Sequence, residues 1–173
     1  MASDWLAEAV GLALLQCQGR VAVAESCTGG GLGQALTAIA GSSAWVEGGF
    51  ITYSNAAKSR LLGVPADLIA AHGAVSRQVV EAMASGARQG LAAEWAVAVS
   101  GVAGPGGGSA HKPVGTVWLA WAGPGGQLGS QGLWFPGDRA AVRQGAVLVG
   151  LTGLLALLAE CCFSGNGGGA GMA

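Results

Sequence analysis

Residues 21–41 read VAVAESCTGGGLGQALTAIAG and decide the fold, because an apolar segment leads through a polar, glycine-rich loop into a second apolar segment. The first segment has the length and composition of a short buried strand. In the last part, apolar side chains share one helical face until Gly41 ends the pattern. A strand therefore enters a helix through a loop that could bind a phosphate, bind a dinucleotide or carry a nucleophile.

Outside this stretch, strand-like and helix-like segments alternate along the chain. Helical periodicity is clear over 6–15 and over 76–92, while WVEGGFITYS and WAVAVSGVAG are typical of strands. The segments GTVWLAWAG and GSQGLWFPG, separated by GPGGQ, predict a hairpin. This order predicts a single-domain α/β/α sandwich with a mixed sheet over residues 5–160, followed by a disordered glycine-rich tail over 164–173.

The composition restricts the partners of the chain. The net charge is −1 and charged residues make up 10% of the sequence, so no basic face is available for nucleic acid. The longest apolar run, 145–159, is shorter than the roughly 20 residues that span a bilayer, which favours a buried or interface helix over a membrane segment. The six tryptophans and this apolar helix exceed what a small monomer covers, so we expect a homo-oligomer, a dimer or larger.

The sequence also predicts a cytoplasmic protein without a metal site. Its amino-terminal segment lacks the basic start and the long apolar core of an export signal. The four cysteines form no CxxC pair and no repeated spacing, so neither a zinc site nor a disulfide framework is indicated. We expect reduced thiols.

The glycine-rich loop matches none of three known glycine motifs. No Lys-Ser or Lys-Thr follows Gly33, as a Walker loop requires, no frame gives G-x-G-x-x-G, and Ser26 lies outside a G-x-S-x-G pattern. What remains is a hydroxyl at a strand end, followed by glycines that let backbone amides point inward at a helix N-terminus. This arrangement is typical of an anion or oxyanion site. The alternative is that Ser26 and Thr28 only cap the helix.

Tyr53 and Lys58 draw attention because both residue types are scarce. Tyr53 is the only tyrosine and Lys58 is one of two lysines, and they lie five residues apart in TYSNAAKS. A lysine whose pKa is lowered in a dry pocket can act as the base for a serine, and a tyrosine can relay or donate a proton. The alternatives are a solvated helix residue for Lys58 and a half-buried strand residue for Tyr53.

Three further side chains are candidates for the same chemistry. Cys27 could be a nucleophile, but next to Ser26 in the chain its side chain should point elsewhere, which favours packing in the core. His72 and His111 stand in loop-like contexts without neighbouring carboxylates. A Ser-His-Asp arrangement is compatible with such spacing, although we expect capping or surface roles for both histidines.

A second glycine-rich loop, SGVAGPGGGSAHKPVG, follows the strand that ends near residue 99. Backbone amides of this loop could approach a phosphate or ribose, with Lys112 as a nearby cation; the alternative is a flexible connection. The candidate positions are Ser100, Gly101 and Gly104. In GDRAAVR, Arg139 and Arg143 share one helical face, which suits either a phosphate or ion pairs with nearby carboxylates.

Taken together, several segments resemble the C-terminal domain of the competence- and damage-inducible CinA family. They are AESCTGG, GSSAWVEGGFITYSNAAKSRLLGV, HGAVS, SGVAGPGGG with KPVGTV, and GDRAAVR, in the family's order, and the resemblance runs from about Trp5 to Ala159. The resemblance implies an α/β/α sandwich, an oligomer, and hydrolysis of the carboxamide of nicotinamide mononucleotide. The products would be nicotinic acid mononucleotide and ammonia in pyridine-nucleotide recycling, with no cofactor.

The resemblance also implies roles for individual residues. The family's nucleophilic serine corresponds to Ser26, and the tyrosine and lysine of its YSNxxK segment correspond to Tyr53 and Lys58. In the mechanism we expect, neutral Lys58 deprotonates Ser26 and Tyr53 helps to pass a proton to the departing ammonia. The backbone amides expected to hold the oxyanion are those of Cys27, Thr28, Gly29 and Gly30. The residues expected to bind the nucleotide are Ser100, Gly101, Ala103, Gly104, Arg139 and Arg143.

Two rival functions are compatible with the same segments. One is a non-catalytic nucleotide-binding or interaction module that keeps the pocket without turnover. The other is a cysteine hydrolase that uses Cys27, which alkylation of the thiol would inactivate.

Overall fold

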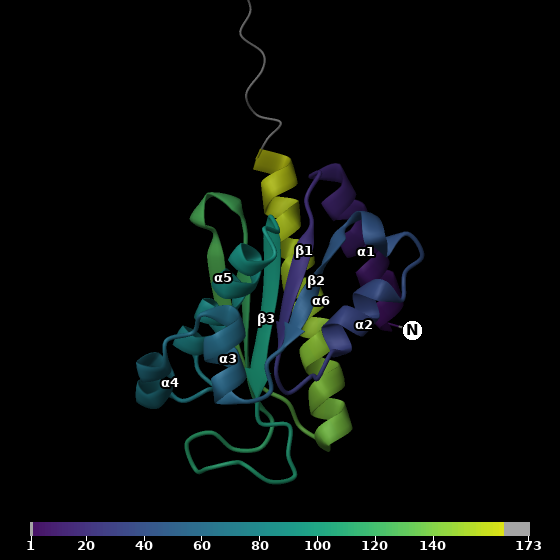
Figure 1. Ribbon diagram of the computed structural model, residues 1–173. Helices are drawn as coiled ribbons and strands as arrows, with labels where there is room; N and C mark the ends of the chain where they lie inside the picture. The colour runs from purple at the N-terminus through teal and green to yellow at the C-terminus, as the bar shows by residue number, and fades with distance from the viewer. Residues whose placement is uncertain (1, 165–173) are drawn as a thin grey trace, which may run out of the picture.

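The computed structural model describes residues 2–164, and within them the chain forms a five-stranded sheet covered on both faces by helices (Figure 1). The strands are β1 (Val21–Glu25), β2 (Val46–Ile51), β3 (Trp95–Gly101), β4 (Thr116–Ala122) and β5 (Leu128–Trp134). The helices are α1 (Ala2–Gln16), α2 (Gly31–Thr37), α3 (Asn55–Leu62), α4 (Ala66–His72), α5 (Arg77–Gly90) and α6 (Arg139–Ser164). The predicted α/β sandwich with a mixed sheet is confirmed. The predicted disordered tail lies, beyond Ser164, outside the described residues.

The order of the strands brings two loops to the same edge of the sheet. The order is β2-β1-β3-β4-β5, and β1 runs parallel to both β2 and β3, so the carboxyl ends of these three strands meet. The chain leaves β1 toward β2 on one side, while β3 lies on the other side. Open α/β sheets bind ligands at such a switch point. β4 and β5 form the antiparallel hairpin that the sequence predicts.

Alternation along the strands gives the sheet two different faces. Successive strand residues point to opposite sides, and in VAVA and WAVAV one side receives valines and the other alanines. The valine face packs beneath α1, α2 and α6, whereas the alanine face lies against α5, on the side of the sheet that α3 and α4 also cover (Figure 1). Alanine side chains let the backbone of α5 lie close to the strands that carry the site.

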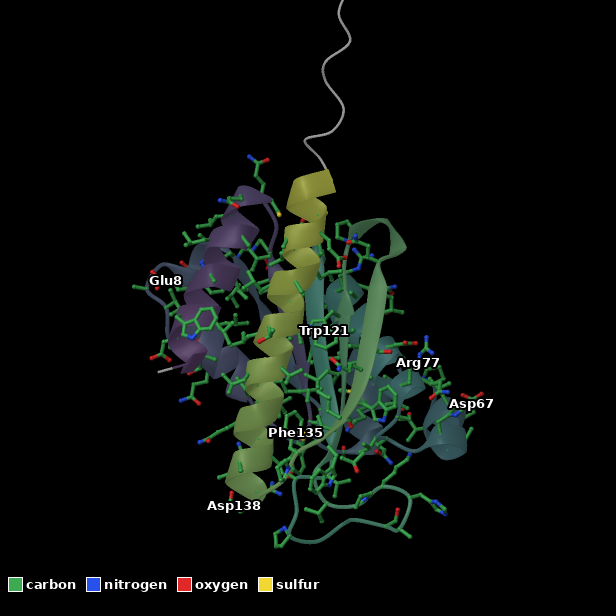
Figure 2. All side chains as sticks on the ribbon, turned by 180° about the vertical axis from the view of Figure 1, so that it is seen from behind. Glu8, Asp67, Arg77, Trp121, Phe135 and Asp138 are labelled. Atoms are coloured by element: carbon green, nitrogen blue, oxygen red, sulfur yellow. The ribbon has the colours of Figure 1, made fainter. Side chains whose placement is uncertain are left out.

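The 26-residue helix α6 lies along the valine face (Figure 2). It is longer than the apolar run 145–159, and by length and composition alone its segment Arg139–Cys161 could cross a membrane. The helix instead packs on the sheet. Its Leu151, Leu154 and Leu158 are buried, and the indole N–H of Trp121 on β4 donates to the Gly150 carbonyl at 2.9 Å. One side of the helix therefore packs on the sheet, while 33% of the apolar segment is buried in all.

Candidate active site

Ser26 follows β1 directly, at the edge where the three parallel strands end. Its amide donates to the Val99 carbonyl of β3 at 3.1 Å, and the Thr52 amide after β2 donates to the Glu25 carbonyl at 2.7 Å. The start of the loop is therefore tied to strands on both sides. Ser26 is only 8% exposed and lines a pocket of about 270 Å³.

Lys58 reaches this serine from the first turns of α3. The helix begins after Ser54, whose hydroxyl accepts from the Ala57 amide at 3.1 Å. Lys58 is 1% exposed, and its Nζ donates to the Thr52 carbonyl at 2.8 Å and to Ser26 Oγ at 3.1 Å. Burial lowers the pKa of Lys58 below its ordinary value of 10.5, because a charged ammonium loses its hydration there. The lysine is thus a buried amine in contact with the hydroxyl, not a solvated helix residue.

The hydroxyls of the loop do not cap α2, so the N-capping alternative is wrong. The N-cap position is Gly30, with a φ of 99° and no side-chain hydrogen bond. Thr28 Oγ1 donates instead to Glu25 Oε2 at 2.6 Å, and Ser26 Oγ accepts from Lys58. The backbone amides at the start of the helix donate instead to a carboxylate that the sequence did not point to.

That carboxylate belongs to Glu25, the last residue of β1, which is 1% exposed. Besides the Thr28 hydroxyl, its Oε2 accepts from the amides of Gly30 at 3.1 Å and Leu32 at 3.0 Å. Its Oε1 accepts from the Gly33 amide at 2.8 Å. The signal in the sequence was a glutamate at the end of a buried apolar strand, because a carboxylate is seldom fully buried unless it is paired.

The four backbone amides expected at the oxyanion site fall into two pairs. The Gly29 amide donates to the Ser26 carbonyl at 3.0 Å, and the Gly30 amide donates to the Glu25 carboxylate. Within the described residues, the amides of Cys27 and Thr28 have no carbonyl or carboxylate acceptor. Of these two residues, Cys27 lines the pocket, whereas Thr28 is fully buried and does not line it.

Cys27 lines the same pocket, but its thiol is unsuited to attack. It is 5% exposed, and burial raises its pKa to about 11, with the nearby Glu25 charge adding to the rise. Its sulfur lies so close to β3 that a Cβ on Gly101 would be 3.1 Å from it. The thiol is packed against β3 and is protonated at neutral pH. This agrees with the prediction that Cys27 packs in the core.

Tyr53 and Arg139 meet at the rim of the pocket. Tyr53 is 61% exposed, and its hydroxyl accepts from Arg139 Nη2 at 2.8 Å. Arg139 Nη1 donates to the Gly104 carbonyl at 2.8 Å. The arginine at the start of α6 therefore joins the segment after β2 to the glycine-rich loop after β3. Both side chains line the pocket together with Ser26 and Lys58.

The glycine-rich loop after β3 forms the opposite wall. All four expected residues line the pocket: Ser100 and Gly101 at the end of β3, and Ala103 and Gly104 in the loop after it. Arg143 and Lys112, in contrast, do not line the pocket: Arg143 Nη2 donates to the Thr28 carbonyl at 2.9 Å, and Lys112 Nζ donates to the His72 carbonyl at 2.8 Å. His72 ends α4 and is not in a loop. Neither His72 nor His111 lines the pocket.

Comparisons with known proteins show which family the chain belongs to. The chain matches the family model described as the CinA C-terminal domain over residues 3–158. It belongs to the CinA C-terminal domain family. The chain is 56% identical over 155 residues to the nicotinamide-nucleotide amidohydrolase PncC of Pseudomonas putida, covering 90% of this chain and 96% of that protein. It is 51% identical over 146 residues to the protein of the same name from Escherichia coli K12, covering 84% of this chain and 88% of that protein.

Solved structures of the same family share the fold of this chain. The competence/damage-inducible protein CihA from Agrobacterium tumefaciens superposes with a TM-score of 0.89 at 44% identity, covering 91% of this chain and 96% of that chain. In this CinA-family chain, the AESCTGG and YSNAAK segments supply Ser26 and Lys58 to one pocket. Within residues 2–164, no group of three or more His, Cys, Asp or Glu side chains is placed to hold a metal ion.

Proposed function

We propose that this chain is an amidohydrolase that converts nicotinamide mononucleotide and water into nicotinic acid mononucleotide and ammonia, in pyridine-nucleotide recycling. The observation that carries the proposal is the contact between Ser26 Oγ and the buried Nζ of Lys58, 3.1 Å apart in the pocket. A hydroxyl beside a buried amine is the arrangement that acyl transfer to serine needs. Relatives named nicotinamide-nucleotide amidohydrolase, 51% and 56% identical, support the same substrate class.

The first half of the reaction forms an ester on the enzyme. Neutral Lys58 accepts the proton of Ser26 while Oγ attacks the carboxamide carbon. One N–H of the amine stays on the Thr52 carbonyl, which holds the nitrogen 3.1 Å from Ser26 Oγ. The negative charge that develops on the carboxamide oxygen is held by the amides of Cys27 and Thr28. The C–N bond then breaks, and the proton held by Lys58 reaches the departing nitrogen, which leaves as ammonia.

The second half returns the enzyme to its starting state. Lys58, neutral again, accepts a proton from a water molecule that attacks the ester carbon. The bond to Ser26 breaks, the proton returns to the serine oxygen, and the carboxylic acid is released. Tyr53 stands at the mouth of the pocket, where its hydroxyl can relay a proton between the site and solvent.

We place the nucleotide between the loop after β3 and the start of α6. The groups proposed to contact it all line the pocket and are Ser100, Gly101, Ala103, Gly104 and Arg139. Arg139 supplies a positive charge at the rim, which suits the phosphate. We assign Arg143 an indirect role, because its guanidinium holds the Thr28 carbonyl and does not line the pocket.

We further propose that the chain acts in the cytoplasm as a homo-oligomer, a dimer or larger. Trp5, Leu12 and Leu15 are exposed by 59%, 59% and 51%, and their spacing places them on one side of α1. Exposed large apolar side chains on one helix face are typical of an association surface. Cys27 and Cys161 are free thiols, which fits a reducing compartment.

The test is an assay of the purified chain with nicotinamide mononucleotide. Ammonia is measured with a coupled dehydrogenase, and nicotinic acid mononucleotide is measured by chromatography. The proposal predicts one ammonia for each acid formed. A nucleotide-binding module without turnover predicts heat of binding in a calorimeter and no ammonia, while a cysteine hydrolase predicts activity that iodoacetamide abolishes.

A further inference from the structure

The Glu25 carboxylate is buried at the end of β1 without a counter-ion. Within the described residues, no Lys or Arg side chain forms an ion pair with it. Its charge is balanced by four donors, the Thr28 hydroxyl and the amides of Gly30, Leu32 and Gly33, at 2.6 to 3.1 Å. An ionised carboxylate buried in this way is stable only while these donors point at it. The carboxylate and the fold of the loop therefore depend on each other.

The side chains of Glu25 and Ser26 lie on different sides of the sheet, because side-chain direction alternates along β1. Neighbouring residues of an extended chain point to opposite faces. Glu25 continues the row of Val21 and Val23 and so points toward α2, on the valine face. Ser26 points the other way, toward Lys58 on α3. The side chain that holds the loop is thus separated from the side chain that reacts.

The carboxylate also decides which amides of the loop are free. The Gly30, Leu32 and Gly33 amides donate to Glu25, while the Gly29 and Gly31 amides donate to the carbonyls of Ser26 and Thr28. The start of α2 is consequently closed to the substrate's phosphate. Only the amides of Cys27 and Thr28, next to Ser26 in the chain, are left without such an acceptor in the described part of the chain.

We propose that Glu25 is a positioning residue for the amidase reaction. Its carboxylate accepts hydrogen bonds from the loop and fixes the loop's conformation. In that conformation Ser26 faces Lys58, and the amides of Cys27 and Thr28 point at the developing oxyanion. This inference rests on the proposed function. Misplacing catalytic groups by about 1 Å can lower a rate roughly a hundredfold, so loss of one acceptor oxygen should be visible in kcat.

The experiment compares Glu25→Gln with the exposed control Glu8→Gln. A glutamine turned to face the Thr28, Gly30 and Leu32 donors presents its NH₂ group to the Gly33 amide, where two donors clash. We expect kcat for nicotinamide mononucleotide to fall at least about tenfold, with KM within about twofold and an unchanged circular dichroism spectrum. Glu8→Gln should match the wild type in both constants.

Thr28→Val is the second variant, because it removes one donor and leaves the carboxylate in place. Its loss of kcat should be smaller than that of Glu25→Gln. The double variant should lose little more than Glu25→Gln alone, since both changes loosen the same contact. Losses that multiply instead would show that the two residues act independently and would overturn the inference.

A second readout does not depend on the natural substrate. The rate at which a fluorophosphonate labels Ser26, followed by intact mass, should fall at least about tenfold in Glu25→Gln and stay unchanged in Glu8→Gln. Wild-type labelling without ammonia release would contradict the proposed function alone. A Glu25→Gln protein that labels and turns over at the wild-type rate, even with a lowered melting temperature, would overturn the inference alone. A wild type that neither labels nor turns over would overturn both.

Discussion

Lys58 Nζ lies 3.1 Å from Ser26 Oγ although the two residues are 32 positions apart in the chain. The serine is held by the end of β1 between two parallel strands, and the lysine is held by the start of α3. Both side chains are buried, so water screens their interaction less than it would at the surface. In the proposed reaction this pair is the chemical centre of the pocket.

The pH dependence of activity should report the buried lysine. Because burial lowers the pKa of Lys58 below 10.5, kcat/KM for nicotinamide mononucleotide should rise with pH through that lowered pKa, as the amine becomes neutral. Lys58→Arg keeps the charge and cannot act as a base, so it should lose at least about a hundredfold in kcat/KM. The histidine variants His72→Ala and His111→Ala should each keep most of the rate. A His72→Ala enzyme without activity would transfer the role of base to that histidine.

The free energy of unfolding should depend on pH through the same lysine. Between the lowered pKa of folded Lys58 and the ordinary value of 10.5, the unfolded chain binds more protons at this position than the folded chain. The free energy of unfolding should therefore gain from this group as pH rises through that window, and below it the penalty for burying the charged amine is fully present. Urea unfolding of the wild type and of Lys58→Met across the alkaline range measures the difference. Parallel curves for the two proteins would contradict the prediction.

Cys27 should be dispensable for catalysis and slow to react. Its thiol is 5% exposed and has a pKa of about 11, so almost none of it is thiolate at pH 8. Cys27→Ala should retain most of the ammonia release, and iodoacetamide at pH 8 should leave the wild-type activity intact. Rapid inactivation by iodoacetamide that Cys27→Ala abolishes would instead support a cysteine nucleophile.

Gly86 should be required for the close packing of α5 against α3. A Cβ at this position would lie 1.9 Å from the backbone carbonyl oxygen of Leu62. Alanine normally stabilises a helix relative to glycine, but here we expect Gly86→Ala to lower the free energy of unfolding by about 1–3 kcal/mol through overpacking. Gly129→Ala on β5, where a Cβ has no neighbour within 4 Å, is the matched control and should stay close to wild type. Equal melting temperatures for both variants would refute this packing argument.

The apolar side of α1 should hold the oligomer together. Light scattering at micromolar concentration should give a dimer mass or larger for the wild type. Leu12→Glu places a charge among the exposed Trp5 and Leu15 and should shift the protein toward the monomer. Thr152→Glu is the control, an exposed position on α6. A wild-type monomer would contradict the proposed assembly.

Most of the fold could be predicted because its signals are local. The strand-loop-helix unit of residues 21–41 and the hairpin around GPGGQ carry their periodicity and turn residues within a few positions. Helix α4 was missed because Ile69 is its one buried residue and gives it no apolar stripe, although Pro65 before it and Gly73 after it mark its ends. Helix α2 is equally short, but Leu32 and Leu36 are both buried and form an apolar face that can be recognised in the sequence.

Some residues of the candidate site could be predicted from the sequence, while contacts that depend on the folded structure could not. Ser26 stands out in the loop, and Lys58 stands out by scarcity, but the burial that makes Lys58 a base depends on how α3 packs against the sheet. The pairing of Glu25 with backbone amides is a property of the folded loop and leaves no spacing pattern in the sequence. Likewise, Arg143 could be placed on a helix face, while its contact with the Thr28 carbonyl required the packing of α6 beside α2.

The most direct test of the account is the rate of ammonia release from nicotinamide mononucleotide by the wild type and by Ser26→Ala, at equal protein concentration. We expect steady release by the wild type and a loss of more than about a thousandfold in Ser26→Ala, with the same circular dichroism spectrum for both. Ser26→Ala that releases ammonia at the wild-type rate, or a well-folded wild type that releases none, would contradict it.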